Sequence, residues 1–185
     1  MSKATAGMAA RRGPRYPDPA IIRGMIASIL ETGRPGYRPS PRPSRLVFKF
    51  IQPGRERLRR GRHLNIRQPN LGLIMKAGRS RTWFVNADDP NIRGLEAEKL
   101  DGGMVTIGLI NEADYMAFNV GGTRRAWEFF VELRGRDEIF LINFTGDRNV
   151  YNALFAIAVA DWLGFTPGQI RRGLRKFRRP RSGCF

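Results

Sequence analysis

The sequence predicts an α/β fold in which a sheet is layered with helices. From residue 82 onward, short runs of β-branched and aromatic residues alternate with longer segments that show the period of a helix. Residues 134–137, Arg-Gly-Arg-Asp, separate two such runs and predict a hairpin turn. At 185 residues and 42% hydrophobic composition, the chain is long enough to form one domain with its own core.

The first expected helix covers residues 20–32, where apolar side chains recur on one face. Pro19 suits its first turn, and Gly33 follows its end. The remaining expected elements are a strand over 46–51, a helix near 55–60, strands over 82–86 and 104–108, a short helix over 92–100, strands over 126–133 and 138–144, and helices over 150–163 and 167–176.

Local signals define the ends of the last two helices. Gly164 is expected to terminate the helix over 150–163, because glycine readily adopts the left-handed conformation that ends helices. Thr166 and Gln169 have the spacing of a capping box, and Pro167 between them suits the first helical position. The last helix is therefore expected to begin at residue 167.

Charge is distributed unevenly along the chain. Residues 1–81 contain 19 Lys or Arg and 3 Asp or Glu, residues 82–170 contain 7 and 13, and residues 171–181 add 7 basic residues. An acidic body therefore lies between two basic ends. We expect a poorly ordered, basic N-terminal arm over 1–45 that contains the first helix, an α/β domain over 46–177, and a basic tail over 178–185.

The composition argues against several classes of protein. No apolar run reaches the roughly eighteen residues of a membrane span, and the N-terminus lacks the apolar core of a signal peptide. Cys184 is the only cysteine and His63 the only histidine, which argues against internal disulfides and against zinc or iron–sulfur sites. We expect a cytoplasmic protein that does not contact a membrane.

Two asparagines stand at the beginning of the Ala-rich helix. Asn149 and Asn152 are spaced i, i+3 and therefore lie on one face of the first turn, beside its free N–H groups. A side-chain amide offers a donor and an acceptor together, which suits the polar edge of adenine. The alternative is that Asn149 is an ordinary N-cap, and the two residues alone do not separate these interpretations.

Two motifs carry a resemblance to a known family. Residues 86–90 read Asn-Ala-Asp-Asp-Pro after an expected strand, and a second pattern is formed in register by Gly146, Asn149, Val150, Asn152, Ala153, Leu154, Ala156, Ile157, Ala158, Leu163, Gly164, Ile170, Leu174 and Phe177. Both resemble landmarks of the central domain of the Mur ligases, the ATP-dependent enzymes that add amino acids to cell-wall precursors. The match extends to the Mur-ligase-like part of cyanophycin synthetase.

The resemblance implies a shortened Mur ligase central domain of the phosphate-loop type. In the family this domain uses ATP and Mg²⁺ to activate a carboxylate, which an amine then attacks. On this chain the resemblance implies that Asn149 and Asn152 contact adenine and that Asp88 lies nearby. It assigns no catalytic residue and no metal ligand.

The phosphate-binding part of the family pattern is missing. The chain contains no Gly-Lys-Ser/Thr, and the family's phosphate lysine and its hydroxyl neighbours align near Pro19, Ala20 and Ile21. Proline has no N–H and isoleucine has no hydroxyl, and the family's C-terminal domain is not recognisable after Phe177. We therefore expect no ligase turnover from this polypeptide alone and at most weak binding of adenine nucleotides, so whether it is an enzyme stays open.

The two aspartates of the first motif allow two interpretations. Asp88 and Asp89 could help to hold Mg²⁺, since carboxylate oxygens are its usual protein ligands. The same residues after a strand are also typical of an ordinary turn, which is the favoured interpretation.

A second hypothesis makes the chain a basic binding protein associated with nucleic acid or the ribosome. The Arg-rich residues 1–81 and 171–181 suit contacts with the phosphate backbone of RNA or DNA. Biased codon usage could also enrich arginine, but the acidic body argues against a bias that acts on the whole chain. Few aromatic residues accompany the arginines, so sequence-specific base stacking is not expected.

Overall fold

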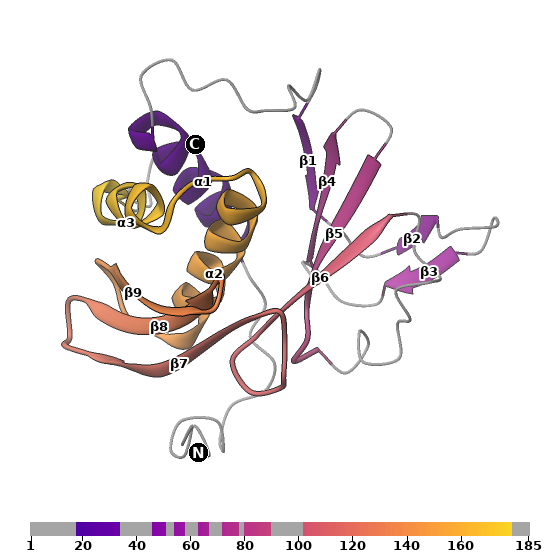
Figure 1. Cartoon of the computed structure of the whole chain (residues 1–185). Coiled ribbons are helices and arrows are strands. Elements are labelled where there is room, and N and C mark those ends of the chain that lie inside the picture. The colour runs from indigo at the N-terminus through magenta and orange to yellow at the C-terminus, as the bar shows by residue number, and fades with distance from the viewer. Residues whose placement is uncertain are drawn as a thin grey trace, which may run out of the picture.

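A computed structural model describes residues 18–33, 46–50, 54–57, 63–66, 72–77, 80–89 and 102–178. Figure 1 shows the helices and strands of these segments. In chain order they are α1 (Pro19–Gly33), β1 (Leu46–Phe50), β2 (Gly54–Arg57), β3 (His63–Ile66), β4 (Gly72–Ala77), β5 (Ser80–Asn86), β6 (Gly103–Gly108), β7 (Tyr115–Gly122), β8 (Trp127–Leu133), β9 (Arg136–Ile142), α2 (Asp147–Trp162) and α3 (Pro167–Lys176).

The fold is a mixed sheet with helices layered on it, as the sequence predicts. Seven strands follow the order β1-β4-β5-β6-β7-β8-β9, and β2 pairs with β3 in a separate two-stranded sheet. β5, β6 and β7 run parallel to one another, whereas β1 with β4, β4 with β5, and β7 through β9 are antiparallel. The carboxyl ends of β5 and β6 therefore open on the same edge, which is where ligands bind in many parallel sheets.

α2 lies at the centre of the structure. Every residue from Val150 to Ala160 is buried, because the helix packs on β5, β6, β7 and β9 and is covered by α1 and α3 (Figure 1). Alanine suits this position, since a small side chain lets neighbouring elements approach closely and loses no rotamer entropy on burial. The Ala-rich composition therefore reflects a helix that is enclosed on both sides.

α1 belongs to this core. Its residues Ile21, Ile22, Met25, Ile26 and Ile29 are buried in the same hydrophobic cluster as α2 and the sheet. The helix that was expected within the basic arm is thus part of the folded body. The other arm residues, 1–17 and 34–45, and the tail residues 179–185 lie outside the described segments, as does the helix expected over 92–100.

Both expected helix ends are confirmed. After α2, Gly164 has a φ of 84°, its N–H donates to the Asp161 carbonyl, and the Phe165 N–H donates to the Ala160 carbonyl. This pair of hydrogen bonds forms a Schellman motif. α3 begins with the predicted capping box between Thr166 and Gln169, with Pro167 at its first position.

The expected hairpin is also present, with a turn shorter than predicted. Arg134 and Gly135 have φ values of 54° and 75°, as in a two-residue type I′ turn, and Leu133 pairs directly with Arg136. The prediction of a helix near 55–60 is wrong over residues 55–57, because residues 54–57 form β2 and pair with β3. β3, β4 and β7 were not expected as strands.

β9 is the last strand on its side of the sheet, and α3 protects part of its free edge. The Arg171 side chain donates from Nε to the Ile139 carbonyl at 2.9 Å and pairs with the Glu138 carboxylate. Its guanidinium also lies 5.9 Å from the centre of the Phe140 ring. None of the described helices is long and apolar enough to cross a membrane.

α1 and α3 cross at two glycines. A Cβ placed on Gly173 would lie 2.4 Å from Ile29 Cα, and one on Gly24 would lie 2.6 Å from a ring carbon of Phe177. The Ser28 hydroxyl donates to the Gly173 carbonyl at 2.8 Å. The close approach therefore requires glycine at position 173, where the obstructing atom belongs to the backbone.

We expect Gly173→Ala to lower the free energy of unfolding by about 1–3 kcal/mol, because the added methyl group forces the two helices apart. Gly168→Ala is the matched control on the same helix, since a Cβ there meets no atom closer than 3.9 Å. It should leave stability unchanged or raise it slightly, because alanine favours helix over glycine. Urea unfolding followed by circular dichroism measures both, and equal effects would contradict the packing argument.

Candidate functional site at the first turn of α2

The carboxylate of Asp88 collects five donors at the carboxyl ends of β5 and β6. The backbone N–H groups of Leu109 and Asn111 donate to it at 2.7 Å each, and that of Ile110 donates at 3.2 Å. The Asn111 side-chain amide donates at 2.7 Å, and the Tyr151 hydroxyl of α2 completes the set. One side chain thus joins β5, the connection from β6 to β7, and α2, and we call this set of hydrogen bonds the Asp88 clamp.

The turn interpretation of the Asn-Ala-Asp-Asp motif is confirmed. Asn86 Oδ1 accepts the N–H of Asp88 at 3.0 Å, and the Asn86 carbonyl accepts the N–H of Asp89 at 3.2 Å. The oxygens of Asp88 face N–H and O–H donors, which is an environment for an anion and not for a cation, so Asp88 does not fit a role as a Mg²⁺ ligand. Within the described segments, no cluster of three or more His, Cys, Asp or Glu residues is placed to hold a metal.

The Tyr151 hydroxyl is held in its neutral form. Burial raises the pKa of Tyr151 well above its ordinary value, and the hydrogen bond to the Asp88 carboxylate raises it further. A raised pKa in the folded state means that stability is fully present below the unfolded pKa of about 10 and is lost as the pH rises above it.

We therefore expect Tyr151 to ionise only as the protein unfolds in alkali. The difference between the tyrosinate absorbance titrations of the wild type and of Tyr151→Phe isolates this one hydroxyl. Its ionisation should coincide with the loss of the circular dichroism signal, above pH 10. Ionisation near pH 10 with the fold intact would contradict the assigned hydrogen bond.

The two predicted asparagines lie in the first two turns of α2, one before and one after Tyr151. Gly146 is the N-cap residue, with a φ of 99°, and no side chain caps this helix. The alternative that Asn149 is the N-cap is therefore wrong. Its side-chain Nδ2 donates instead to the Thr145 carbonyl at 2.7 Å, which leaves its Oδ1 directed to no donor in the described part of the chain.

Asn152 is buried, with 1% of its surface exposed. Its Oδ1 accepts the backbone N–H of Asp18 at 2.7 Å, whereas its Nδ2 has no hydrogen-bond partner. A buried donor without a partner is costly, and such groups often mark a place that a ligand or water fills. The two amides together thus retain one acceptor and one donor.

Asp18 connects the beginnings of α1 and α2. Its Oδ1 accepts the N–H groups of Ala20 and Ile21 at 3.0 and 3.4 Å, so Asp18 is the N-cap of α1. Its other carboxylate oxygen lies 3.8 Å from the Arg148 guanidinium on α2. This contact could not be predicted from the sequence, because 134 residues separate Asp18 from Asn152.

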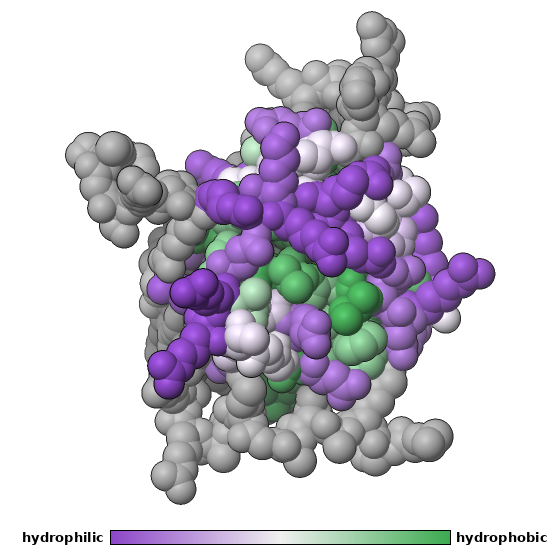
Figure 2. Space-filling model, turned by 90° about the vertical axis from the view of Figure 1, so that its left-hand side faces the viewer, coloured by the Kyte–Doolittle hydropathy of each residue, from purple (hydrophilic) through white to green (hydrophobic). Residues whose placement is uncertain are grey.

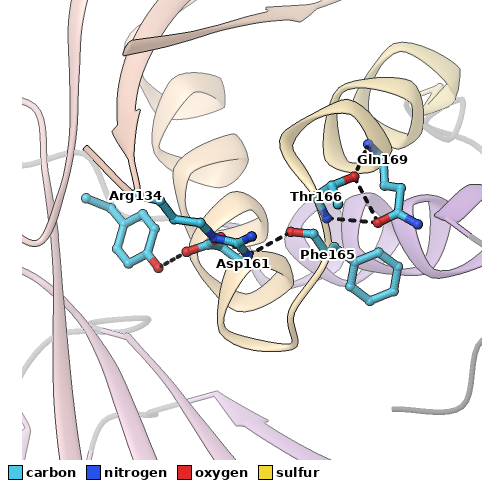
Figure 3. Close-up of polar contacts among 6 residues, drawn as sticks. Arg134, Asp161, Phe165, Thr166 and Gln169 are labelled. Atoms are coloured by element: carbon cyan, nitrogen blue, oxygen red, sulfur yellow. Dashed lines mark hydrogen bonds and ion pairs between the residues drawn. The ribbon is translucent and has the colours of Figure 1, made fainter. Parts of the chain in front are cut away.

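A second polar cluster holds the opposite end of α2 (Figure 3). Asp161 pairs with Arg134 of the hairpin turn at 2.8 Å and accepts the Tyr115 hydroxyl at 2.8 Å. Arg134 also donates to the Phe165 carbonyl at 3.2 Å, next to the capping box of α3. Burial, followed by the hydrogen bond to Asp161, raises the pKa of Tyr115 above its ordinary value. α2 is therefore held by a polar contact at each end.

The family model of the Mur ligase middle domain matches residues 63–160, which is more than half of the chain. The chain belongs to this family. The matched region contains the Asp88 clamp and the N-terminal turns of α2 with Asn149 and Asn152, whereas Asp18 and the whole of α3 lie outside it. The predicted Mur ligase resemblance is thus confirmed.

Known relatives match about half of the chain. A UDP-N-acetylmuramate–L-alanine ligase of Cereibacter sphaeroides is 37% identical over 95 residues, which is 49% of this chain and 20% of that protein. A UDP-N-acetylmuramoyl-L-alanyl-D-glutamate–2,6-diaminopimelate ligase of Clostridium perfringens is 32% identical over 100 residues, 52% of this chain and 20% of that protein. The match spans about a fifth of the length of these relatives.

Solved structures overlap with the chain only loosely. MurF from Acinetobacter baumannii has a TM-score of 0.48 at 21% identity and covers 54% of this chain and 22% of its own. The UDP-N-acetylmuramate–alanine ligase MurC from Thermotoga maritima has a TM-score of 0.47 at 17% identity, over 90% of this chain and 43% of its own. The family assignment rests on the sequence match and not on these overlaps.

Proposed function

We propose that this chain is a Mur ligase middle domain that keeps a site for adenine and does not itself handle the triphosphate. The observation that carries the proposal is the pair of amides on the first turn of α2. Asn149 Oδ1 is available as an acceptor and the buried Asn152 Nδ2 as a donor. Adenine offers the complementary pair on one edge, an amino group beside a ring nitrogen.

The reaction class follows from the relatives. Those that match are ligases of muramyl precursors, and ligation of a carboxylate to an amine with ATP and Mg²⁺ is the role that the family implies, in the cytoplasm. Because the match covers a fifth of those proteins, we propose that any such reaction needs parts from beyond the matched residues. The acceptor and the amino acid would be recognised by those parts.

The beginning of α1 supports the absence of turnover by this polypeptide alone. The chain has no Gly-Lys-Ser/Thr, and α1 begins with Asp18 and Pro19. The N–H groups of Ala20 and Ile21, which could face an anion at the helix N-terminus, donate to the Asp18 carboxylate instead. A phosphate would have to displace a carboxylate that is covalently attached beside the helix.

We expect adenosine to bind with low affinity, and Asn149→Ala and Asn152→Ala each to weaken binding by about tenfold, the effect of losing one buried hydrogen bond. Asn143→Ala is the matched control, because Asn143 makes its side-chain hydrogen bond to the Arg175 carbonyl at 2.8 Å, outside this site. Isothermal titration calorimetry measures the affinities. A phosphate-release assay with ATP and Mg²⁺ should show no turnover.

Two results would contradict these expectations separately. The proposed purine site would be contradicted if adenosine did not bind, or if it bound equally tightly to the wild type and all variants. Robust ATP hydrolysis by the purified chain would show that phosphate chemistry survives without the missing loop.

A second candidate function is the binding of a polyanion such as RNA, and α3 supplies the observation that favours it. Its buried face carries Ile170, Gly173 and Leu174, and its solvent face exposes Arg172 and Arg175, with further basic residues beside them at 176 and 178. Figure 2 shows hydrophilic side chains gathered across this side of the molecule. Such a stripe suits contacts with a phosphate backbone.

We expect replacement of Arg172 and Arg175 by Gln to reduce the slope of log affinity for single-stranded RNA against log salt by about 1.4, two contacts at about 0.7 each. Replacement of Arg124 and Arg125 by Gln removes the same charge from another exposed segment and should leave the slope unchanged. Fluorescence anisotropy at several salt concentrations measures the slopes. Equal slopes for both double variants, or no RNA binding, would contradict a role for α3.

The contribution of the N-terminal arm is tested by a truncation that stops at residue 17. A longer deletion would remove α1, whose apolar face lies in the core. Loss of RNA binding on removal of 1–17 would extend the interface to the arm.

A further inference from the structure

Asp18 lies where the N-termini of two helices meet. Its carbonyl accepts the first helical hydrogen bond of α1, from the Ile22 N–H at 3.0 Å, and its carboxylate accepts from Ala20 and Ile21. Its own N–H donates to Asn152 in the second turn of α2. Both helices therefore direct the positive ends of their dipoles toward this junction.

Such a junction would ordinarily attract anions. Unpaired N–H groups and aligned dipoles at a helix N-terminus favour phosphate and carboxylate groups. Here the chain supplies its own anion, because the Asp18 carboxylate takes the N–H groups of α1 and lies 3.8 Å from Arg148. A second acidic residue, Asp147, stands in the first turn of α2.

The neighbouring donor points to a neutral ligand. Asn152 Nδ2 is buried and lacks a partner, and the Oδ1 of the same amide is held by the N–H of Asp18. An incoming anion that reached this amide would lie close to the Asp18 carboxylate and be repelled by it. An uncharged acceptor, such as a ring nitrogen of a purine, meets no such repulsion.

We infer that Asp18 is a built-in counter-ion that makes this site select an uncharged purine, as base or nucleoside, and exclude the phosphorylated forms. The inference rests on the proposed purine site and names its ligand class. It assigns two roles to Asp18: its backbone N–H orients the Asn152 amide, and its carboxylate excludes phosphate. The site is therefore a nucleoside site and not a nucleotide site.

The test compares three probes with three proteins. Adenosine, ATP and inorganic pyrophosphate are titrated by calorimetry, without added metal, into the wild type, Asp18→Asn and Asp147→Asn. Asparagine caps helices as well as aspartate does, so Asp18→Asn removes the charge and keeps the cap. Asp147→Asn changes the net charge equally at a position that does not cap α1.

The wild type should bind adenosine more tightly than ATP and should not bind pyrophosphate measurably. Asp18→Asn should raise the affinity for ATP and pyrophosphate at least tenfold and change that for adenosine less than twofold. Asp147→Asn should have a smaller effect on all three probes. Asp18→Ser, which also preserves a cap, replaces Asp18→Asn if circular dichroism shows that the latter is unfolded.

Failure of this inference and failure of the purine proposal give different results. The counter-ion role of Asp18 is overturned if the wild type binds ATP more tightly than adenosine. It is also overturned if the Asp18 variants bind pyrophosphate no more tightly than the wild type does. Absence of adenosine binding in every variant overturns the purine site, and with it the assigned ligand class. A higher affinity of the Asp18 variants for pyrophosphate would then still support the exclusion of anions by Asp18.

Discussion

The Asp88 carboxylate fixes the arrangement on which the rest of the structure depends. It stands at the end of β5 and accepts three backbone N–H groups of the loop after β6, a side-chain amide and the Tyr151 hydroxyl. Hydrogen bonds to a charged group each contribute about 1.5–3 kcal/mol. Removal of the carboxylate would leave the buried Tyr151 hydroxyl and the donors of the loop after β6 without this acceptor, so the two parallel strands and α2 keep their relative positions through this group.

Polar contacts near both ends of α2 fix the position of this enclosed helix relative to the sheet. The hydrogen bond from Tyr151 fixes one end, and the contacts of Asp161 with Arg134 and Tyr115 fix the other. Asn149 and Asn152 are therefore held in fixed positions relative to the sheet, as the proposed purine site requires.

The sequence predicts best those features whose signals lie close together along the chain. The Thr166–Gln169 capping box, the turn after Leu133 and the Asn86–Asp89 turn are each specified within four residues, and all three are present. β7 escaped prediction because it contains Asn119 with a positive φ and ends in two glycines, and its strand character depends on pairing with β6 and β8. The partners of Asp18 and Asp88 could not be predicted either, since they are 21 to 134 residues away.

The contact of Arg171 with the free edge of β9 affects how another copy of the chain could pair with this strand. An uncovered outer strand offers a row of backbone groups to which another molecule can add a strand, and sheets that grow in this way aggregate. The Arg171 guanidinium donates a hydrogen bond to the Ile139 carbonyl and places a positive charge beside that row. At this point of the border, a strand from another copy of the chain would have to displace the Arg171 side chain before it could pair.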